Sequence, residues 1–393
     1  MFGANSDIAL AQASVESAAA NVTVAGQLPN PTFTAQTTQY SPIGGLGAGR
    51  PTDKALDTIV GISIPIERGS KAALRREAAL EQLSGARHDL RDMRRQQLLA
   101  LYQGYYDLKL GEERHALAVQ TRGLAAQALS AADKRVTAGD LAAVDRDRLM
   151  VEALRAANEV TSAESDIRQA RVALAVLLGR KREGETTPRA ELKTDDLTAS
   201  DPWPAPAPEE AGTAASLGLR ADVAAAEARV TAASAGRAVA RSLRTRDITV
   251  GAQIERVPSS TPGFTFGVNV SFPLFARYGF EGEIARAEAD YTTALLLRQK
   301  VVNQAEADGN KARAMLDGAR RRLASFEADI LPAAKRALDA IEFAYAHGAA
   351  GLTDVLDARR TWHAIQVDLA VARADYAKAR AAWRAATEWE SGT

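Results

Sequence analysis

The sequence predicts a mainly helical protein with a small β portion, in which long antiparallel coiled-coil helices accompany four β-strands. Two observations predict this class, and the first is helix length. Residues 70–136 contain no proline and carry apolar side chains at heptad-like spacing, and residues 281–345 match them except at Pro332, where we expect a kink or a break. At ~1.5 Å per residue, a continuous helix over the first stretch would be roughly 100 Å long, which is unusual in a globular domain.

The second observation is period-2 alternation over runs of about ten residues. Residues 263–272 place phenylalanine and valine on one face and mostly small polar residues on the other, and residues 247–257 alternate in the same way. Weaker runs cover residues 32–40 and 58–66. Such alternation is typical of strands with one apolar face and one wet face.

Four strands cannot close a barrel by themselves, and their apolar faces need a cover. Two arrangements would supply it. Either helices of the same chain cover the sheet, as in an α+β domain, or several chains pool their strands into one barrel with lipid outside and water inside. A trimer would contribute about twelve strands, and the long helices favour this second arrangement.

The composition excludes several classes of function. The 49 basic and 49 acidic residues balance, so nucleic acid is not expected as a partner. There are no cysteines, which removes disulfides, thiolate nucleophiles and cysteine-based metal sites. No apolar stretch is long enough for a transmembrane helix, and residues 1–30 lack the features of a signal peptide, so we expect the natural N-terminus to lie upstream.

The sequence divides into two similar halves joined by a linker. Residues 1–183 form the first predicted repeat, with a helical hairpin at about 70–180. Residues 213–393 form the second, with a hairpin at about 280–390. The linker, residues 184–212, contains alternate prolines, which predict a semi-rigid extended segment.

The turns of the two hairpins correspond closely. Gly139 and Asp145 recur as Gly348 and Asp354, both at an offset of 209 residues (348 − 139 and 354 − 145). The correspondence favours duplication of one unit. Glycine permits the positive φ that a helix reversal can require, so Gly139 and Gly348 are the predicted tip turns.

Taken in order, these motifs resemble the TolC-type outer-membrane efflux family over nearly the whole chain. The matching segments are Leu331–Tyr345 leading into Gly348, Leu352–Arg359, Arg135–Gly139 with Asp145, and the proline-containing strand ends Phe272–Phe275 and Ile64–Ile66. In addition, Leu28-Pro-Asn-Pro31 resembles the CzcC-like branch, which serves heavy-metal cation efflux.

The resemblance implies a homotrimer, with a roughly twelve-stranded β-barrel in outer-membrane lipid and an α-helical barrel in the periplasm. It implies a passive duct rather than an enzyme, docked to a periplasmic adaptor protein and an inner-membrane RND pump, with heavy-metal cations as the cargo. Drug efflux or type I secretion is the alternative within the family. The alternative from another class is a soluble coiled-coil scaffold.

Asp354 and Asp357 are three residues apart, so their carboxylates share one helix face. Threefold symmetry would gather these pairs around one axis, and the resemblance places the acidic constriction of the pore at the matching positions. The structural alternative is that aspartates in a first helical turn cap free N–H groups and meet the helix dipole favourably.

The resemblance also assigns a tip latch to Tyr345 and Asp145, whose hydrogen bonds would hold inner and outer helix pairs together. Ala350 stands where well-known members carry a basic residue, so Arg135 is a candidate replacement. The turns at Gly139 and Gly348 would be the surface that docks the adaptor.

No catalytic residue, cofactor or metal site is predicted. The four histidines form no i,i+4 pair of the kind that binds zinc on a helix. The glycine-rich run Gly44–Gly49 lacks the Lys-Ser/Thr of a phosphate-binding loop, and it predicts a mobile extracellular loop instead.

Overall fold

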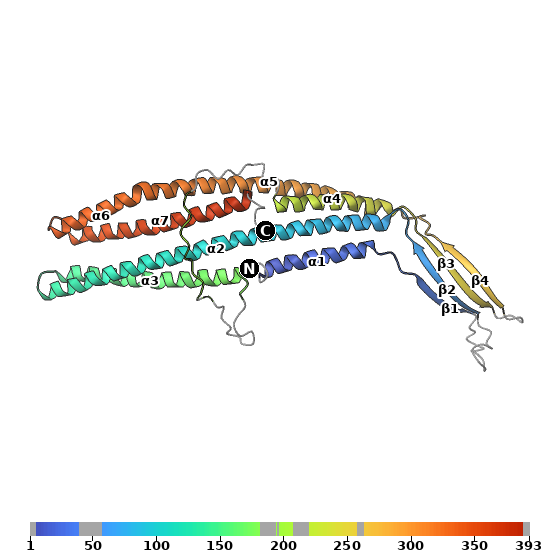
Figure 1. Cartoon of the computed structure of the whole chain (residues 1–393), viewed down its shortest axis with the longest axis horizontal. Helices are drawn as coiled ribbons and strands as arrows, with labels where there is room; N and C mark the ends of the chain where they lie inside the picture. The colour runs from blue at the N-terminus through green and yellow to red at the C-terminus, as the bar shows by residue number, and fades with distance from the viewer. Residues whose placement is uncertain are drawn as a thin grey trace, which may run out of the picture. The chain divides into compact units, whose positions relative to one another are not determined.

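The computed structural model describes residues 5–38, 57–180, 194, 196–206, 220–257 and 263–387. Its elements in chain order are α1 (Ser6–Gly26), β1 (Thr32–Thr38), β2 (Asp57–Ile66), α2 (Lys71–Thr137), α3 (Ala143–Leu177), α4 (Ala221–Ser242), β3 (Ile248–Val257), β4 (Gly263–Ser271), α5 (Glu281–Ser325), the π-helical turn η3 (Phe326–Ile330), α6 (Leu331–Ala346) and α7 (Leu352–Thr387) (Figure 1). Two compact units are distinguished, 1–12 with 89–223 and 301–393, and 13–88 with 224–300. Each is described by itself.

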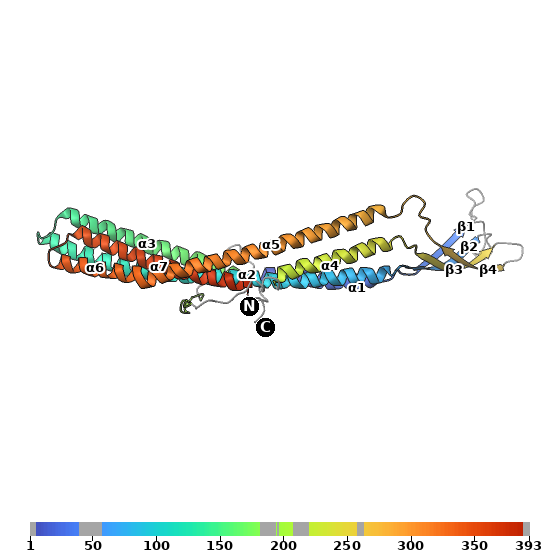
Figure 2. The same ribbon diagram turned by 90° about the horizontal axis from the view of Figure 1, so that it is seen from above.

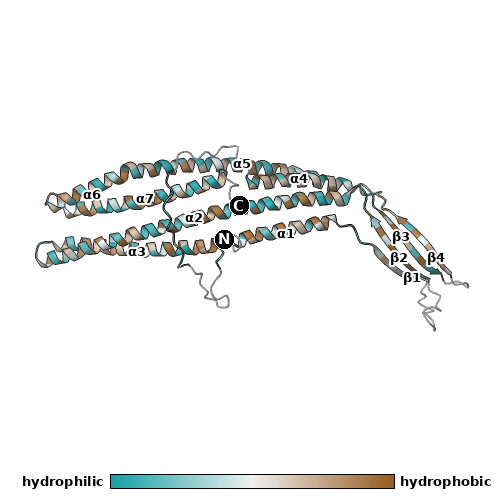
Figure 3. Cartoon of the chain, viewed as in Figure 1, coloured by the Kyte–Doolittle hydropathy of each residue, from teal (hydrophilic) through white to brown (hydrophobic). Residues whose placement is uncertain are grey.

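The four strands form one antiparallel sheet in the order β1-β2-β3-β4. Val60 faces Ile254, which faces Phe266, so apolar side chains form rows across one face. These three residues are 41%, 53% and 71% exposed. Figure 3 shows the alternation of apolar and polar residues along each strand. The four predicted strands are confirmed, and the helical segments of the second unit leave these apolar residues exposed.

The strand bounds differ slightly from those expected. The run at 263–272 ends at Ser271, and the run at 247–257 begins at Ile248. Residues 39 and 40 of the first predicted strand lie outside the described residues, as does the glycine-rich run 44–49.

Glycines keep the opposite, polar face of the sheet flat. Gly61 and Gly267 both pair with Gln253, from the strands on its two sides. A Cβ atom at Gly61 would lie 3.1 Å from the Gln253 Cβ, and one at Gly267 would lie 3.2 Å from its Cγ. The Gln253 side chain therefore lies along the sheet. It occupies space that a side chain at Gly61 or Gly267 would fill.

The long helices occupy the predicted stretches. α2 contains 67 residues without interruption. At Pro332 the helix is not broken: the backbone at Ile330 and Leu331 stays helical, and the Leu331 N–H bonds to the Phe326 carbonyl five residues back. Proline has no N–H to donate, and its ring would clash with the carbonyl four residues back in a regular α-helix. The predicted break is therefore corrected to a π-helical turn, which widens the helix just before the proline, and the predicted kink stays a prediction.

Small residues form much of the helix packing in the first unit. Half of the buried residues of α7 are alanines: Ala370, Ala372, Ala374, Ala377, Ala379 and Ala386. Larger side chains fill separate clusters, one of which contains Leu323, Phe326, Leu369 and Tyr376 around the π-helical turn. Alanine at the contacts lets the helix backbones approach closely, as the coiled-coil prediction requires.

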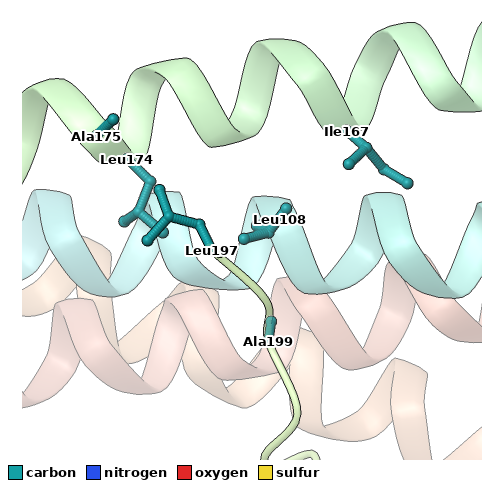
Figure 4. Packing of buried hydrophobic residues seen from close by; sticks show 6 residues of the cluster. All are labelled: Leu108, Ile167, Leu174, Ala175, Leu197 and Ala199. Atoms are coloured by element: carbon teal, nitrogen blue, oxygen red, sulfur yellow. The ribbon is translucent and has the colours of Figure 1, made fainter. Parts of the chain in front are cut away.

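The predicted linker, 184–212, is described only at 194 and 196–206, and there it is neither helix nor strand. Leu197 and Ala199 are buried in a cluster with Leu108 of α2 and Leu174 of α3 (Figure 4). The division into two repeats stays a prediction.

An ion pair in the second unit ties the start of α2 to the residue before β3. Lys71, whose side chain is 8% exposed, donates to both carboxylate oxygens of Asp247 at 2.8 Å. The Arg68 backbone N–H donates to the same carboxylate at 3.0 Å. Burial by itself would raise the pKa of Asp247, but these hydrogen bonds hold it below its usual range.

We expect Asp247→Asn to lower the free energy of unfolding by about 1–3 kcal/mol, because it leaves the Lys71 charge buried without a counterion. The figure is below that of a fully buried pair because the Asp247 side chain is 39% exposed. Urea unfolding of the detergent-solubilised protein measures the change. The contribution should be complete above pH ~4 and lost as the pH falls through the lowered folded pKa of Asp247.

The matched control is Asp290→Asn. Asp290 pairs with Arg286 on the surface, with side chains 67% and 84% exposed. It should change stability by less than ~0.5 kcal/mol. An equal loss in both variants would contradict the role given to Lys71 and Asp247.

Candidate functional site

The candidate site is the tip of the first unit, where two helix reversals lie at the same end in both views (Figures 1 and 2). Residues 138–142 join α2 to α3, and residues 347–351 join α6 to α7. Gly139 has φ +84° and Gly348 has φ +75°. No atom lies within 4 Å of a Cβ built on either glycine, so the backbone conformation, not space, requires glycine here.

The two reversals close with the same hydrogen bond. The Asp140 N–H donates to the Arg135 carbonyl at 2.8 Å, and the Ala349 N–H donates to the Ala344 carbonyl at 2.8 Å. Each bond spans five residues, as in a Schellman motif at a helix C-terminus. The donors differ by 209 positions (349 − 140), the offset found between the two halves of the sequence.

Asp354 and Asp357 have different surroundings near the start of α7. The Asp354 carboxylate accepts a hydrogen bond from the Gly351 N–H at 2.9 Å, which satisfies a free donor before the first helical residue. The Asp357 side chain is 70% exposed and lies 3.2 Å from Arg360. Asp354 therefore has a capping role, whereas the exposed Asp357 carboxylate pairs, among the described residues, with an arginine of its own helix.

The structure brings together two of the three expected latch residues. Arg135 of α2 donates to the Tyr345 hydroxyl of α6 at 3.5 Å, which links the first hairpin to the second. Asp145 instead contacts Arg148 at 3.3 Å, within its own helix.

A stronger link between the hairpins was missed by the sequence analysis. Arg360 of α7 binds both carboxylate oxygens of Glu152 on α3, at 2.5 Å and 3.0 Å. These hydrogen bonds hold the pKa of the Glu152 carboxyl below its usual range, against the effect of burial. The sequence held one indication of a contact at Glu152. This residue follows Asp145 by seven positions, one heptad, and so shares the helix face of a residue already expected to face the other hairpin.

Ion pairs also close each hairpin on itself. Arg146 of α3 lies 2.9 Å from Asp133 of α2, and Arg359 of α7 lies 2.7 Å from Glu342 of α6. The two acidic partners are again 209 positions apart (342 − 133). The arginines are not at matching positions, so duplication of the sequence does not by itself reveal these pairs.

Below the polar contacts, apolar residues join the first hairpin to α7. Ala132, Leu149 and Leu356 are buried together. They line a groove of about 350 Å³ whose other walls include Arg135, Tyr345 and Arg359. Most polar contacts around this groove are between exposed side chains, which suits a reversible closure better than a chemical reaction.

Within the residues that the structure describes, no three histidine, aspartate or glutamate side chains gather as metal ligands would. None of the helices in the described part of the chain combines the length and the apolar character needed to cross a lipid bilayer.

The sequence is similar to two proteins with names that report a function. It is 26% identical over 313 residues to the cobalt-zinc-cadmium resistance protein CzcC of Cupriavidus metallidurans, covering 76% of this chain and 69% of that protein. It is 27% identical over 317 residues to the pyoverdine export outer membrane protein OpmQ of Pseudomonas aeruginosa, covering 78% of this chain and 64% of that protein. The matched segment spans about two thirds of each relative.

The fold is similar to that of the outer-membrane channel OprN, with a TM-score of 0.79, at 19% sequence identity. The superposition covers 98% of this chain and 87% of that channel. Residues 3–180 and 214–387 match the family described as outer membrane efflux protein. The chain, with its paired helical hairpins and four-stranded sheet, therefore belongs to the outer membrane efflux protein family.

Proposed function

We propose that three copies of this chain form a passive export duct, with the sheets joined into a barrel in outer-membrane lipid and the helical hairpins in the periplasm. The observation that carries this proposal is the uncovered apolar face of the sheet. On β4 alone, four alternate residues between 60% and 78% exposed lie on that face: Phe264, Phe266, Val268 and Val270. Such a band is costly in water and favourable in lipid.

The free edges of the sheet support the same assembly. Among the described residues, β1 and β4 each pair with one neighbouring strand, so both edges of this sheet present backbone groups without a strand partner. In lipid these groups must be satisfied by protein, because no water is present to bond them. Pairing β4 of one copy with β1 of the next closes about twelve strands without an edge.

The full-length protein should therefore be recovered from the membrane fraction and run as a trimer in native mass spectrometry. Val268→Asp, on the apolar face, should reduce insertion at least ~10-fold, because a carboxylate at mid-bilayer costs several kcal/mol. Asn269→Asp, one residue along on the polar face, is the control and should insert normally. A soluble monomer would support the scaffold alternative and contradict the duct.

The tip would be the periplasmic entrance, held closed by the contacts between the hairpins. The bidentate pair of Glu152 with Arg360 is the strongest of these by geometry. The bond from Arg135 to Tyr345, at 3.5 Å, is at the long limit for a hydrogen bond. Separation of the hairpins would break both contacts and expose the groove between them.

Glu152→Gln should raise the resting conductance of the protein in planar bilayers about fivefold, because it removes the charged partner of Arg360. Tyr345→Phe should raise it less, since the hydroxyl accepts a single long bond. Wild-type leak should stay level from pH 8 to about pH 5, above the ordinary pKa of a glutamate, and should rise only as the pH falls through the lowered pKa of Glu152. A larger effect of Tyr345→Phe would reverse the ranking proposed here.

The carboxylates of Asp354 and Asp357 would give the entrance a negative potential. Three copies would place six carboxylates near one axis, and such a ring favours cations. This chemistry favours heavy-metal cations as cargo, the class reported in the name of one relative, over the pyoverdine named for the other.

Asp357→Asn should weaken block by multivalent cations more than Asp354→Asn does, because the Asp357 carboxylate is exposed whereas that of Asp354 bonds to the Gly351 N–H. Conductance in rising concentrations of Co²⁺ measures the block. An expected shift of ~10-fold in the blocking concentration corresponds to removal of three charges from the ring. Identical block in wild type and both variants would remove the acidic ring from the proposal.

The partners would be a periplasmic adaptor protein and an inner-membrane pump. The exposed reversals at Gly139 and Gly348 are the surfaces proposed for the adaptor. Their hydrogen-bonded form and positive φ fix their shape, so a docking helical hairpin would meet a preformed surface.

A further inference from the structure

The segment 196–206, which joins the two halves of the chain, is anchored on α2 and α3. Leu197 and Ala199 are 8% and 5% exposed and pack against Leu108 and Ile167 (Figure 4). Lys109 donates to the Ala199 carbonyl at 3.2 Å. A mere spacer would not bury apolar side chains between two helices, so this connector is part of the packed structure.

Trp203 is the centre of a second anchor, on α2. Its indole Nε1–H donates to the Glu113 carboxylate at 2.6 Å. Its ring stacks on Tyr106, with centroids 6.1 Å apart and planes 20° from parallel, and the Lys109 ammonium lies 5.1 Å from the ring centroid. Hydrogen bond, stacking and cation–π contact together fix the position of one side chain.

The same Glu113 carboxylate connects the connector to the second hairpin. Arg373 of α7 donates to Glu113 at 3.5 Å and to Glu327 of the π-helical turn at 3.3 Å. The Glu113 carboxylate of α2 thus accepts hydrogen bonds from both the connector and α7. This series of contacts, from Glu113 on α2 through Arg373 on α7 to Glu327, ends in the π-helical turn.

A second link reaches the same turn. The Tyr376 hydroxyl of α7 donates to the Ala205 carbonyl of the connector at 3.4 Å. Tyr376 is 2% exposed and packs with Phe326, the first residue of η3. The connector therefore holds the region of the π-helical turn through two side chains of α7.

The π-helical turn is a suitable hinge for the second hairpin. Its hydrogen bonds span five residues, and Pro332 next to it has no N–H to donate. α6 begins directly after the turn and contains 16 residues, with Tyr345 near its far end. At ~1.5 Å per residue, a small rotation at the turn would move the Tyr345 end through a lever arm of roughly 20 Å.

We propose that the connector is a clasp that holds η3, α6 and α7 against α2 and so keeps the tip closed, with Trp203, Glu113 and Arg373 as its positioning residues. The proposal rests on the duct function proposed above. When the clasp is formed, Arg360 and Tyr345 stay within reach of their partners on the first hairpin. When it is released, the second hairpin rotates at the π-helical turn and those contacts separate.

A matched control lies on the same two helices. Lys378 of α7 pairs with Asp107 of α2, and no hydrogen bond or ion pair identified in the described part of the chain joins this pair to residues 196–206 or to the π-helical turn. If any ion pair between α2 and α7 held the tip, Asp107→Asn would act like a clasp variant. If the clasp holds it, Asp107→Asn leaves the tip unchanged.

The experiment compares resting conductance in planar bilayers for the full-length wild type, Trp203→Phe, Glu113→Ala and Asp107→Asn. Phenylalanine keeps a smaller ring that can still stack on Tyr106, and it removes the Nε1–H that bonds to Glu113. We expect Trp203→Phe to raise leak about fivefold, Glu113→Ala to raise it further because both bonds to the carboxylate are lost, and Asp107→Asn to leave it within about twofold. Trimer melting temperature should be unchanged in Trp203→Phe.

A second readout follows the hinge directly. In Trp203→Phe, hydrogen exchange of backbone amides in residues 326–331 should be at least ~5-fold faster than in wild type, while exchange in the sheet stays the same. The clasp would be overturned if Trp203→Phe and Glu113→Ala both kept the leak and the exchange rates of the wild type. It would also be overturned if Asp107→Asn raised the leak as much as the clasp variants do. A wild-type protein that forms no channel would overturn the duct instead, and the exchange measurement would still decide whether the clasp restrains the hinge.

Discussion

The apolar face of the four-stranded sheet is the constraint on which the rest of this structure depends. Val60, Ile254 and Phe266 form one of its cross-strand rows, and the helical segments of the second unit leave these residues exposed. A face of this kind has to be buried in lipid or against other chains. Because the two edge strands also lack partners, closure with further copies satisfies the side chains and the backbone together. Trimeric assembly in lipid is thus the proposal that meets both needs.

The helical part follows a different physical rule. Its contacts combine alanine at the helix seams, several small clusters of larger apolar side chains, and ion pairs at the tip. Small seams let two hairpins lie close together and slide or rotate at modest cost. In the proposed duct, the Glu152–Arg360 pair and the bond from Arg135 to Tyr345 would favour one arrangement without making it permanent. A duct that opens for cargo needs this balance.

The connector and the π-helical turn also bear on how firmly the two hairpins are held together. Pro332 removes a hydrogen bond from a long helix, and the chain accommodates the loss in a wider turn at Phe326–Ile330. Trp203 and Tyr376 bring the connector to that turn from a distant part of the sequence. The π-helical turn, where the long helix lacks a regular hydrogen bond, therefore lies beside the connector. This arrangement is the basis for the proposed clasp.

The sequence by itself determined the helix lengths, the four strands and the glycine reversals, because these depend on local periodicity and on residues such as Gly139 and Gly348 that act through their own backbone. The family resemblance also pointed to Asp354, Asp357, Tyr345 and Arg135 as residues of the tip, and their roles stay predictions. Tertiary structure alone decided that Asp354 caps α7, that Asp145 pairs within its own helix, and that Glu152 meets Arg360 across 208 positions (360 − 152). It also decided that Pro332 follows a π-helical turn and that Trp203 is held by Glu113. Pairing partners depend on which faces of distant helices meet, and periodicity fixes the face of each helix without fixing the neighbour it finds.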